Sequence, residues 1–63
     1  MRYKAILRYE DGRSYVEQSD KLNVAEHFYD CFVENGIRSG QGFYVSLMYN
    51  GYEKMSFNGW HTA

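Results

Sequence analysis

His27 and Cys31 come closest, by type and spacing, to residues that could form a chemical site. They stand four positions apart in a stretch with a helical pattern, so the imidazole and the thiol share one face and could offer two ligands to a metal ion. A protein metal site needs three or four ligands, and the other imidazole, His61, lies close to the end of the chain. We therefore interpret Cys31 as a core thiol and His27 as a surface residue, and predict no metal and no cofactor.

Motifs for catalysis are also missing from the sequence. A reactive cysteine needs a positively charged neighbourhood that stabilises its thiolate, whereas Asp30 and Glu34 flank Cys31. The segment Gly40-Gln41-Gly42 lacks the following lysine or helix of a phosphate-binding loop. Because no acid, base and nucleophile converge, we predict no catalytic residues and a protein that is not an enzyme.

Three carboxylates, Glu26, Asp30 and Glu34, recur every four residues along the same helical stretch and form an acidic ridge. One interpretation is an ordinary solvated helix face. The other is a surface that docks on a basic groove or on the Arg and Lys side chains of a partner.

Length and composition limit what can position these groups. A chain of 63 residues has room for one domain, residues 1–63, and buries only about 60% of the surface that it exposes when unfolded. Cys31 is the single cysteine, which excludes an internal disulfide, whereas the aromatic content of 19% offers heavy side chains for a small core. The net charge of −1 argues against bulk electrostatic attachment to nucleic acid or to an anionic membrane.

The sequence contains no long apolar segment. Its first ten residues lack the apolar region of a signal peptide, and no stretch approaches the ~20 apolar residues of a membrane span. We expect a cytoplasmic protein that does not bind membranes.

Residues 2–9 alternate between two sets of side chains, as in a half-buried strand, and Asp11-Gly12 predicts a two-residue hairpin turn. In that register Leu7 faces Val16. One face then holds a core set of Tyr3, Ala5, Leu7, Tyr9 and Val16, and the other holds Lys4, Arg8, Glu10, Arg13, Tyr15 and Glu17.

A helix is predicted over residues 24–35. Asn23 and Glu26 fit a capping box at its start, and Asn35-Gly36 fits a left-handed end with Ile37 touching back on the last turn. Its apolar arc comprises Val24, Ala25, Phe28, Tyr29, Cys31, Phe32 and Val33.

A second hairpin is predicted over residues 43–49 and 52–57, around the turn Asn50-Gly51. Both of its faces are substantially apolar, so the pattern does not decide which one is inward. We expect Phe43, Val45 and Leu47 to point inward, and Tyr44, Met48 and Met55 to lie partly outside. Trp60 either folds back on the domain or contributes to a contact surface.

These elements predict an α+β fold, ββαββ, in which one antiparallel four-stranded sheet packs on one helix. The other face of the sheet has no covering element. We expect that face to present Arg2, Lys4, Arg8, Arg13, Tyr15 and Tyr44. Arginine interleaved with tyrosine suits a protein hot spot, the stacked bases of single-stranded nucleic acid, or ordinary surface. A homodimer closed through this face is a further alternative.

The arrangement of YKAILRYEDGRSYVEQ, NVAEHFYDCFVENG and GFYVSLMYNGYEKMSF resembles that of small orphan proteins of phages and mobile elements, among them anti-CRISPR proteins. The resemblance is one of layout and covers nearly the whole chain. It implies an inhibitor that occupies a surface of a host nucleoprotein complex, in the host cytoplasm, and blocks its nucleic-acid binding. The near-neutral charge favours a specific protein surface over wholesale DNA mimicry.

The predicted function is therefore a non-catalytic protein-binding module, and the alternative is a small nucleic-acid-binding protein that uses the same sheet face. The predicted partner-binding residues are Arg2, Lys4, Arg8, Arg13, Tyr15, Tyr44, Glu26, Asp30 and Glu34.

Overall fold

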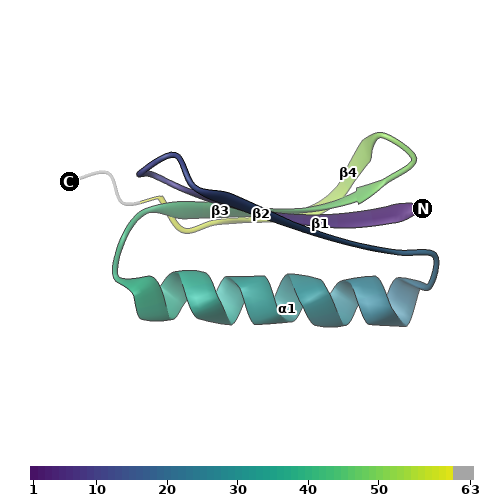
Figure 1. The fold of residues 1–63 in the computed structure, drawn as a ribbon, viewed down its shortest axis with the longest axis horizontal. Helices are drawn as coiled ribbons and strands as arrows, with labels where there is room; N and C mark the ends of the chain where they lie inside the picture. Colours follow the sequence, from purple (N-terminus) through teal and green to yellow (C-terminus); the bar gives the residue numbers. More distant parts are fainter. Residues whose placement is uncertain (61–63) are drawn as a thin grey trace.

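The computed structural model describes residues 1–60 of the 63-residue chain. The elements follow in the order β1 (Tyr3–Tyr9), β2 (Ser14–Ser19), α1 (Leu22–Ser39), β3 (Phe43–Tyr49) and β4 (Tyr52–Asn58). The strands form one antiparallel sheet in the order β2-β1-β3-β4, and α1 lies along one face of it (Figure 1). The predicted ββαββ fold of the α+β class is confirmed.

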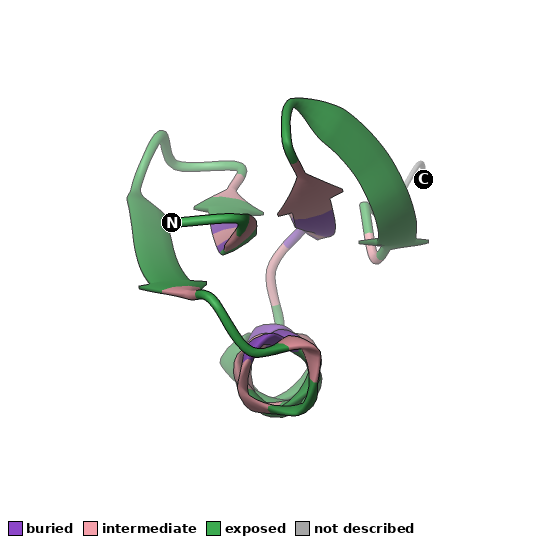
Figure 2. Cartoon of the chain, turned by 90° about the vertical axis from the view of Figure 1, so that its right-hand side faces the viewer, coloured by how far each residue is buried: buried purple, intermediate pink, exposed green. Residues whose placement is uncertain are grey.

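The core lies between α1 and the two central strands. Its buried side chains are Ala5, Leu7, Ala25, Tyr29, Phe43, Val45 and Leu47, which confirms the expected inward face of β3. Figure 2 shows α1 beneath the centre of the sheet, with exposed edge strands on either side. One helix is too narrow to cover four strands, so β2 and β4 extend beyond its shelter.

The first hairpin has a three-residue loop, and the predicted two-residue turn at Asp11-Gly12 is wrong. The Tyr9 N–H donates to the Arg13 carbonyl (2.9 Å), the Gly12 N–H donates to the Tyr9 carbonyl (3.1 Å), and Gly12 has a φ of 94°. A glycine in the left-handed region at the last loop position is typical of three-residue hairpin loops. Leu7 therefore faces Tyr15 instead of Val16.

This shift of one residue reverses the faces of β2. Val16, expected in the core, lies opposite Ile6 on the face away from α1 and is 48% exposed. Tyr15 and Glu17, expected on the uncovered face, lie opposite Leu7 and Ala5 on the α1 side. The edge strand tolerates this exchange of faces because α1 does not bury β2.

The helix begins two residues earlier than predicted. Lys21 is its N-cap residue, and the Lys21 side chain makes no capping hydrogen bond. The predicted capping box of Asn23 and Glu26 is therefore wrong. The Ser19 hydroxyl instead accepts the Lys21 N–H (3.1 Å), and Leu22 packs against the core as part of the first turn. No helix in residues 1–60 is long and apolar enough to span a membrane.

The helix also continues past Gly36, which was predicted to end it. Gly36 is buried within α1 beside the ring of Phe43, and the left-handed residue that ends the helix is Gly40, with a φ of 74°. Ile37, expected to fold back on the last turn, is 61% exposed. Gly36 has no side chain, so the Phe43 ring packs closely on the helix at this position while the backbone remains helical.

The second hairpin turns at Asn50-Gly51 as predicted, with φ values of 48° and 88°. An irregularity in β4 then changes the register, so that Met48 faces Glu53 whereas Leu47 faces Met55. Met55 and Phe57 therefore lie on the α1 side, although the uninterrupted alternation groups them with Tyr44. Both stay partly exposed because α1 does not cover β4.

The chain after β4 continues alongside the start of β3 in the same antiparallel register. The Gly59 N–H donates to the Phe43 carbonyl (2.9 Å), and the half-exposed ring of Trp60 lies beside Gly42. His61 lies outside the described residues.

Candidate partner-binding surface

The face of the sheet turned away from α1, which we call the open face, has no covering element in the described part of the chain. Its side chains form three cross-strand rows: Ser14, Arg8, Tyr44 and Asn58; Val16, Ile6, Ser46 and Ser56; and Gln18, Lys4, Met48 and Glu53. The open face is thus a mixed surface of cations, hydroxyl groups and apolar side chains.

Three cations, Arg2, Lys4 and Arg8, follow the central strand β1 and form what we call the basic column. All three side chains are exposed. The backbone of Arg2 is held on both sides, because its N–H donates to the Asp20 carboxylate and its carbonyl accepts the Asn50 N–H, each at 3.0 Å. Among residues 1–60 the one ion pair within 4 Å joins Arg13 to Asp11, so the basic column has no ion-pair partner.

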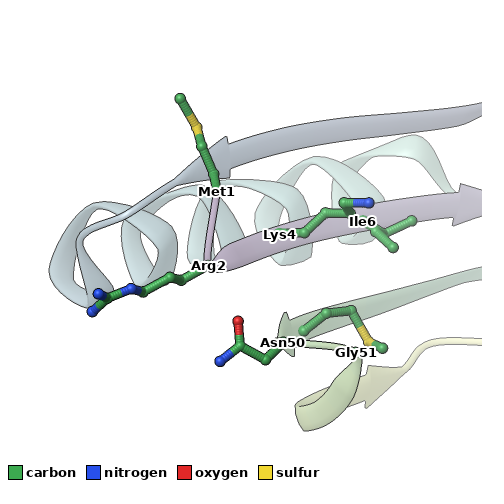
Figure 3. Close-up of a pocket in the computed structure, with 7 residues that line it drawn as sticks. Met1, Arg2, Lys4, Ile6, Asn50 and Gly51 are labelled. Atoms are coloured by element: carbon green, nitrogen blue, oxygen red, sulfur yellow. The ribbon is translucent and has the colours of Figure 1, made fainter.

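An apolar area lies within the basic column. Ile6 is half-buried between Lys4 and Arg8, and the exposed Val16 lies directly across from it on β2. Towards the start of β1 the surface is hollowed by about 200 Å³, lined by Met1, Arg2, Lys4, Ile6, Met48, Asn50 and Gly51 (Figure 3). The hollow has an apolar floor and two cations at its rim.

The carboxylate of Glu53 on β4 contacts side chains of β3 on the open face. Glu53 accepts a hydrogen bond from the Tyr44 hydroxyl (2.9 Å) and another from the Ser46 hydroxyl (3.1 Å). Tyr44 is therefore on the open face as expected, but its hydroxyl is already bound within the domain. Glu53 was not among the predicted site residues, although the Asn50-Gly51 turn places it on the same face as Tyr44.

Arg13 and Tyr15 are not on the open face, contrary to expectation. Tyr15 packs edge-on against Tyr9, with 6.0 Å between ring centroids, and the Arg13 guanidinium carbon lies 5.0 Å from the same Tyr9 ring. Arg13 also donates from its side chain to Asp11 at 2.7 Å. The hydrogen bond from the Arg13 backbone N–H, with the guanidinium close by, lowers the pKa of Asp11. These residues form a separate surface at the tip of the first hairpin.

The acidic ridge of Glu26, Asp30 and Glu34 is exposed on the outer side of α1. The helix that carries this ridge lies on the other side of the sheet from the open face (Figure 2). The ridge and the basic column therefore cannot contact the same flat surface of a partner.

His27 and Cys31 meet along one turn of the helix. The Cys31 Sγ lies 3.6 Å from the His27 Nε2, a distance that allows a weak hydrogen bond to sulfur. Within residues 1–60 no three His, Cys, Asp or Glu side chains are grouped in a way that could hold a metal ion.

Sequence reasoning missed the apolar part of the surface. Ile6 belongs to the same alternating set as Lys4 and Arg8, and this alternation was the available signal for it. Val16 had no such signal, because its face depends on the length of the hairpin loop.

The chain matches no protein-family model, no curated protein and no solved structure. The fold and surface themselves define its class, a small helix-backed antiparallel sheet with one uncovered, cation-bearing face.

Proposed function

We propose that this chain is a non-catalytic protein-binding module whose open face docks on an acidic surface of a partner protein. This proposal rests on the basic column, whose three exposed cations form no ion pair within residues 1–60 and surround the apolar pair Ile6 and Val16. Protein interfaces combine an apolar centre with a polar rim, and charge complementarity orients the partner. The hollow at the start of β1 adds a concave subsite for a protruding side chain.

The open face fits a protein better than a single-stranded nucleic acid. Stacked bases require exposed aromatic rings beside cations. The open face carries one aromatic side chain, Tyr44, and places the carboxylate of Glu53 next to it. Tyr15, which was expected on the open face, belongs to the other side of the sheet.

The resemblance in layout to phage-encoded inhibitors adds a class of partner, a nucleoprotein complex of the host cytoplasm. Docking through the open face turns the acidic ridge of Glu26, Asp30 and Glu34 away from the partner. Three carboxylates in that position repel the phosphate backbone of an approaching nucleic acid. Inhibition then combines occupation of an acidic protein surface with exclusion of nucleic acid.

The proposal is tested by capture from a bacterial lysate with matched charge reversals. Arg8→Glu reverses a cation of the basic column, and Arg38→Glu makes the same change on an exposed residue in the last turn of α1. We expect the wild type and Arg38→Glu to retain the same protein from the lysate. The amount of this protein that Arg8→Glu retains should be at least tenfold lower. Equal retention by the two variants contradicts docking through the open face.

A salt titration separates this function from nucleic-acid binding. We expect no measurable affinity for single-stranded or duplex DNA or RNA at moderate salt, whereas a nucleic-acid binder shows an affinity that falls steeply as salt rises. Steep salt-dependent binding that Arg8→Glu removes would establish the alternative.

A further inference from the structure

β4 is an edge strand with apolar side chains that α1 leaves uncovered. It pairs with β3 alone among the described strands, and all seven of its residues are exposed. Met55 and Phe57 lie on the α1 side with 37% and 39% of their surface exposed. An uncovered strand edge offers unpaired N–H and C=O groups to another chain.

An apolar groove runs between this strand and the helix. It has a volume of about 230 Å³ and is lined by Gly36, Ile37, Phe43, Phe57, Asn58 and Gly59. Phe57 stacks on Phe43 at 5.6 Å between ring centroids, which holds its ring at the mouth of the groove. Ile37, on the helix side, is 61% exposed.

The charges of β4 do not protect its edge. Glu53 is turned over the open face towards Tyr44 and Ser46, and the Lys54 ammonium lies 6.0 Å from the centroid of the Tyr3 ring. The remaining residues, 55–58, carry no charge. The opposite edge, β2, has the exposed Glu17 in its middle, which is the usual protection of an edge strand.

We propose that β4 pairs with β4 of a second copy of this chain, antiparallel about a two-fold axis at Ser56. In this register Ser56 faces Ser56 of the second copy, and Phe57 of each copy faces Met55 of the other. The axis is perpendicular to the sheet, so both helices lie on the same side of a continuous eight-stranded sheet. Met55, Phe57 and Ile37 of both copies then fill the space between the helices.

The strand itself favours a second copy as the occupant. An isologous contact requires a patch that complements itself, and Met55 and Phe57, two positions apart on one face, meet this requirement about Ser56. The same register places Lys54 opposite the uncharged Asn58, so no like charges meet across the axis.

The interface of such a dimer extends beyond the strand edge. A stable interface buries about 800 Å² per partner, roughly a fifth of the 4353 Å² of this chain. The groove beside Ile37 and Phe57 adds apolar surface to the edge of β4 in this interface.

Sedimentation over a range of protein concentrations tests this pairing. We expect a reversible dimer for the wild type and a monomer for Met55→Lys, which places a cation opposite Phe57 of the second copy. Val16→Lys makes the same kind of change on the open face and is expected to remain dimeric. A wild type that stays monomeric up to several hundred micromolar overturns the proposal, and so does a dimer that Val16→Lys disrupts and Met55→Lys does not.

A cross-linking experiment tests the register. Directly opposed residues of an antiparallel pair have Cα atoms about 4.5–5.5 Å apart, within disulfide range. We expect Ser56→Cys, in a Cys31→Ser background, to form a disulfide-linked dimer under a mild thiol oxidant at least tenfold faster than Ser14→Cys on β2. Equal rates for the two variants overturn the pairing at Ser56. Neither experiment involves the partner of the open face, so the two proposals fail independently.

Discussion

The ring of Phe43 packs against Gly36, where α1 presents no side chain to the sheet. A Cβ atom at position 36 would overlap this ring, and a Cβ atom at Gly59 would overlap it from the other side. Phe43 is 2% exposed and stacks on Phe57. This contact joins the last turns of the helix to β3 and to the end of β4, and it forms the floor of the groove beside β4.

Gly36→Ala is expected to destabilise the protein, although alanine is the better helix former by about 1 kcal/mol. Forcing a methyl group against a buried ring typically costs ~1–3 kcal/mol, which exceeds the gain in helix propensity. Urea unfolding followed by circular dichroism, at one protein concentration, measures the difference. Asn35→Ala, at the exposed neighbouring position, is the control and should change little. A Gly36→Ala variant at least as stable as this control contradicts the packing.

Gly12→Ala tests the three-residue loop. The φ of 94° is unfavourable for an L-residue, and nothing within 4 Å would touch the added methyl group, so the cost is conformational alone. We expect a loss of about 1–2 kcal/mol in the free energy of unfolding. D-Alanine at the same position, introduced by chemical synthesis, accepts a positive φ and should preserve the stability. Equal effects of the two enantiomers would exclude this loop.

The pKa of Asp11 predicts a pH dependence. The Arg13 backbone N–H and its guanidinium stabilise the carboxylate, so the pKa of Asp11 is lower in the folded than in the unfolded chain. A lowered pKa adds stability above the unfolded value of about 3.8, and this stability disappears as pH falls through the folded pKa. The melting temperature of the wild type should exceed that of Asp11→Asn at pH ~6, and the difference should shrink at pH ~2. A difference that does not change with pH contradicts the contact.

The pKa of Tyr29 predicts that the stability of the folded state falls at alkaline pH. Burial raises the pKa of its phenol, and the nearby Asp30 carboxylate adds to the effect. The folded state therefore keeps the phenol proton at pH values where the unfolded chain has lost it. This contribution to stability is complete below the unfolded value of 10.0 and is lost as pH rises through the folded pKa. Tyr29→Phe should therefore lose less stability than the wild type above pH ~10. Phenolate absorbance, measured together with thermal unfolding, identifies the ionisation of Tyr29 as the step that Tyr29→Phe lacks. Identical alkaline unfolding of the two proteins would contradict the burial of Tyr29.

The residues of the basic column could be predicted because they belong to β1, where alternation alone sorts side chains into two faces. Arg2, Lys4 and Arg8 keep their predicted side in the structure. Arg13 and Tyr15 do not, because their side depends on whether the hairpin loop has two or three residues. Asp11-Gly12 is compatible with both loop lengths, and the hydrogen bonds of Tyr9 with Arg13 and Gly12 distinguish them.

Periodicity and turn residues act locally, so the order of the residues was enough to predict the types and order of the elements and the inward face of β1. Tertiary structure alone decided where the helix ends and which way the edge strands face. Packing of Phe43 on Gly36 extends the helix to Ser39, and the irregularity after Glu53 turns Met55 and Phe57 towards α1. Both depend on contacts between different elements, and such contacts leave no periodic signal in the order of the residues.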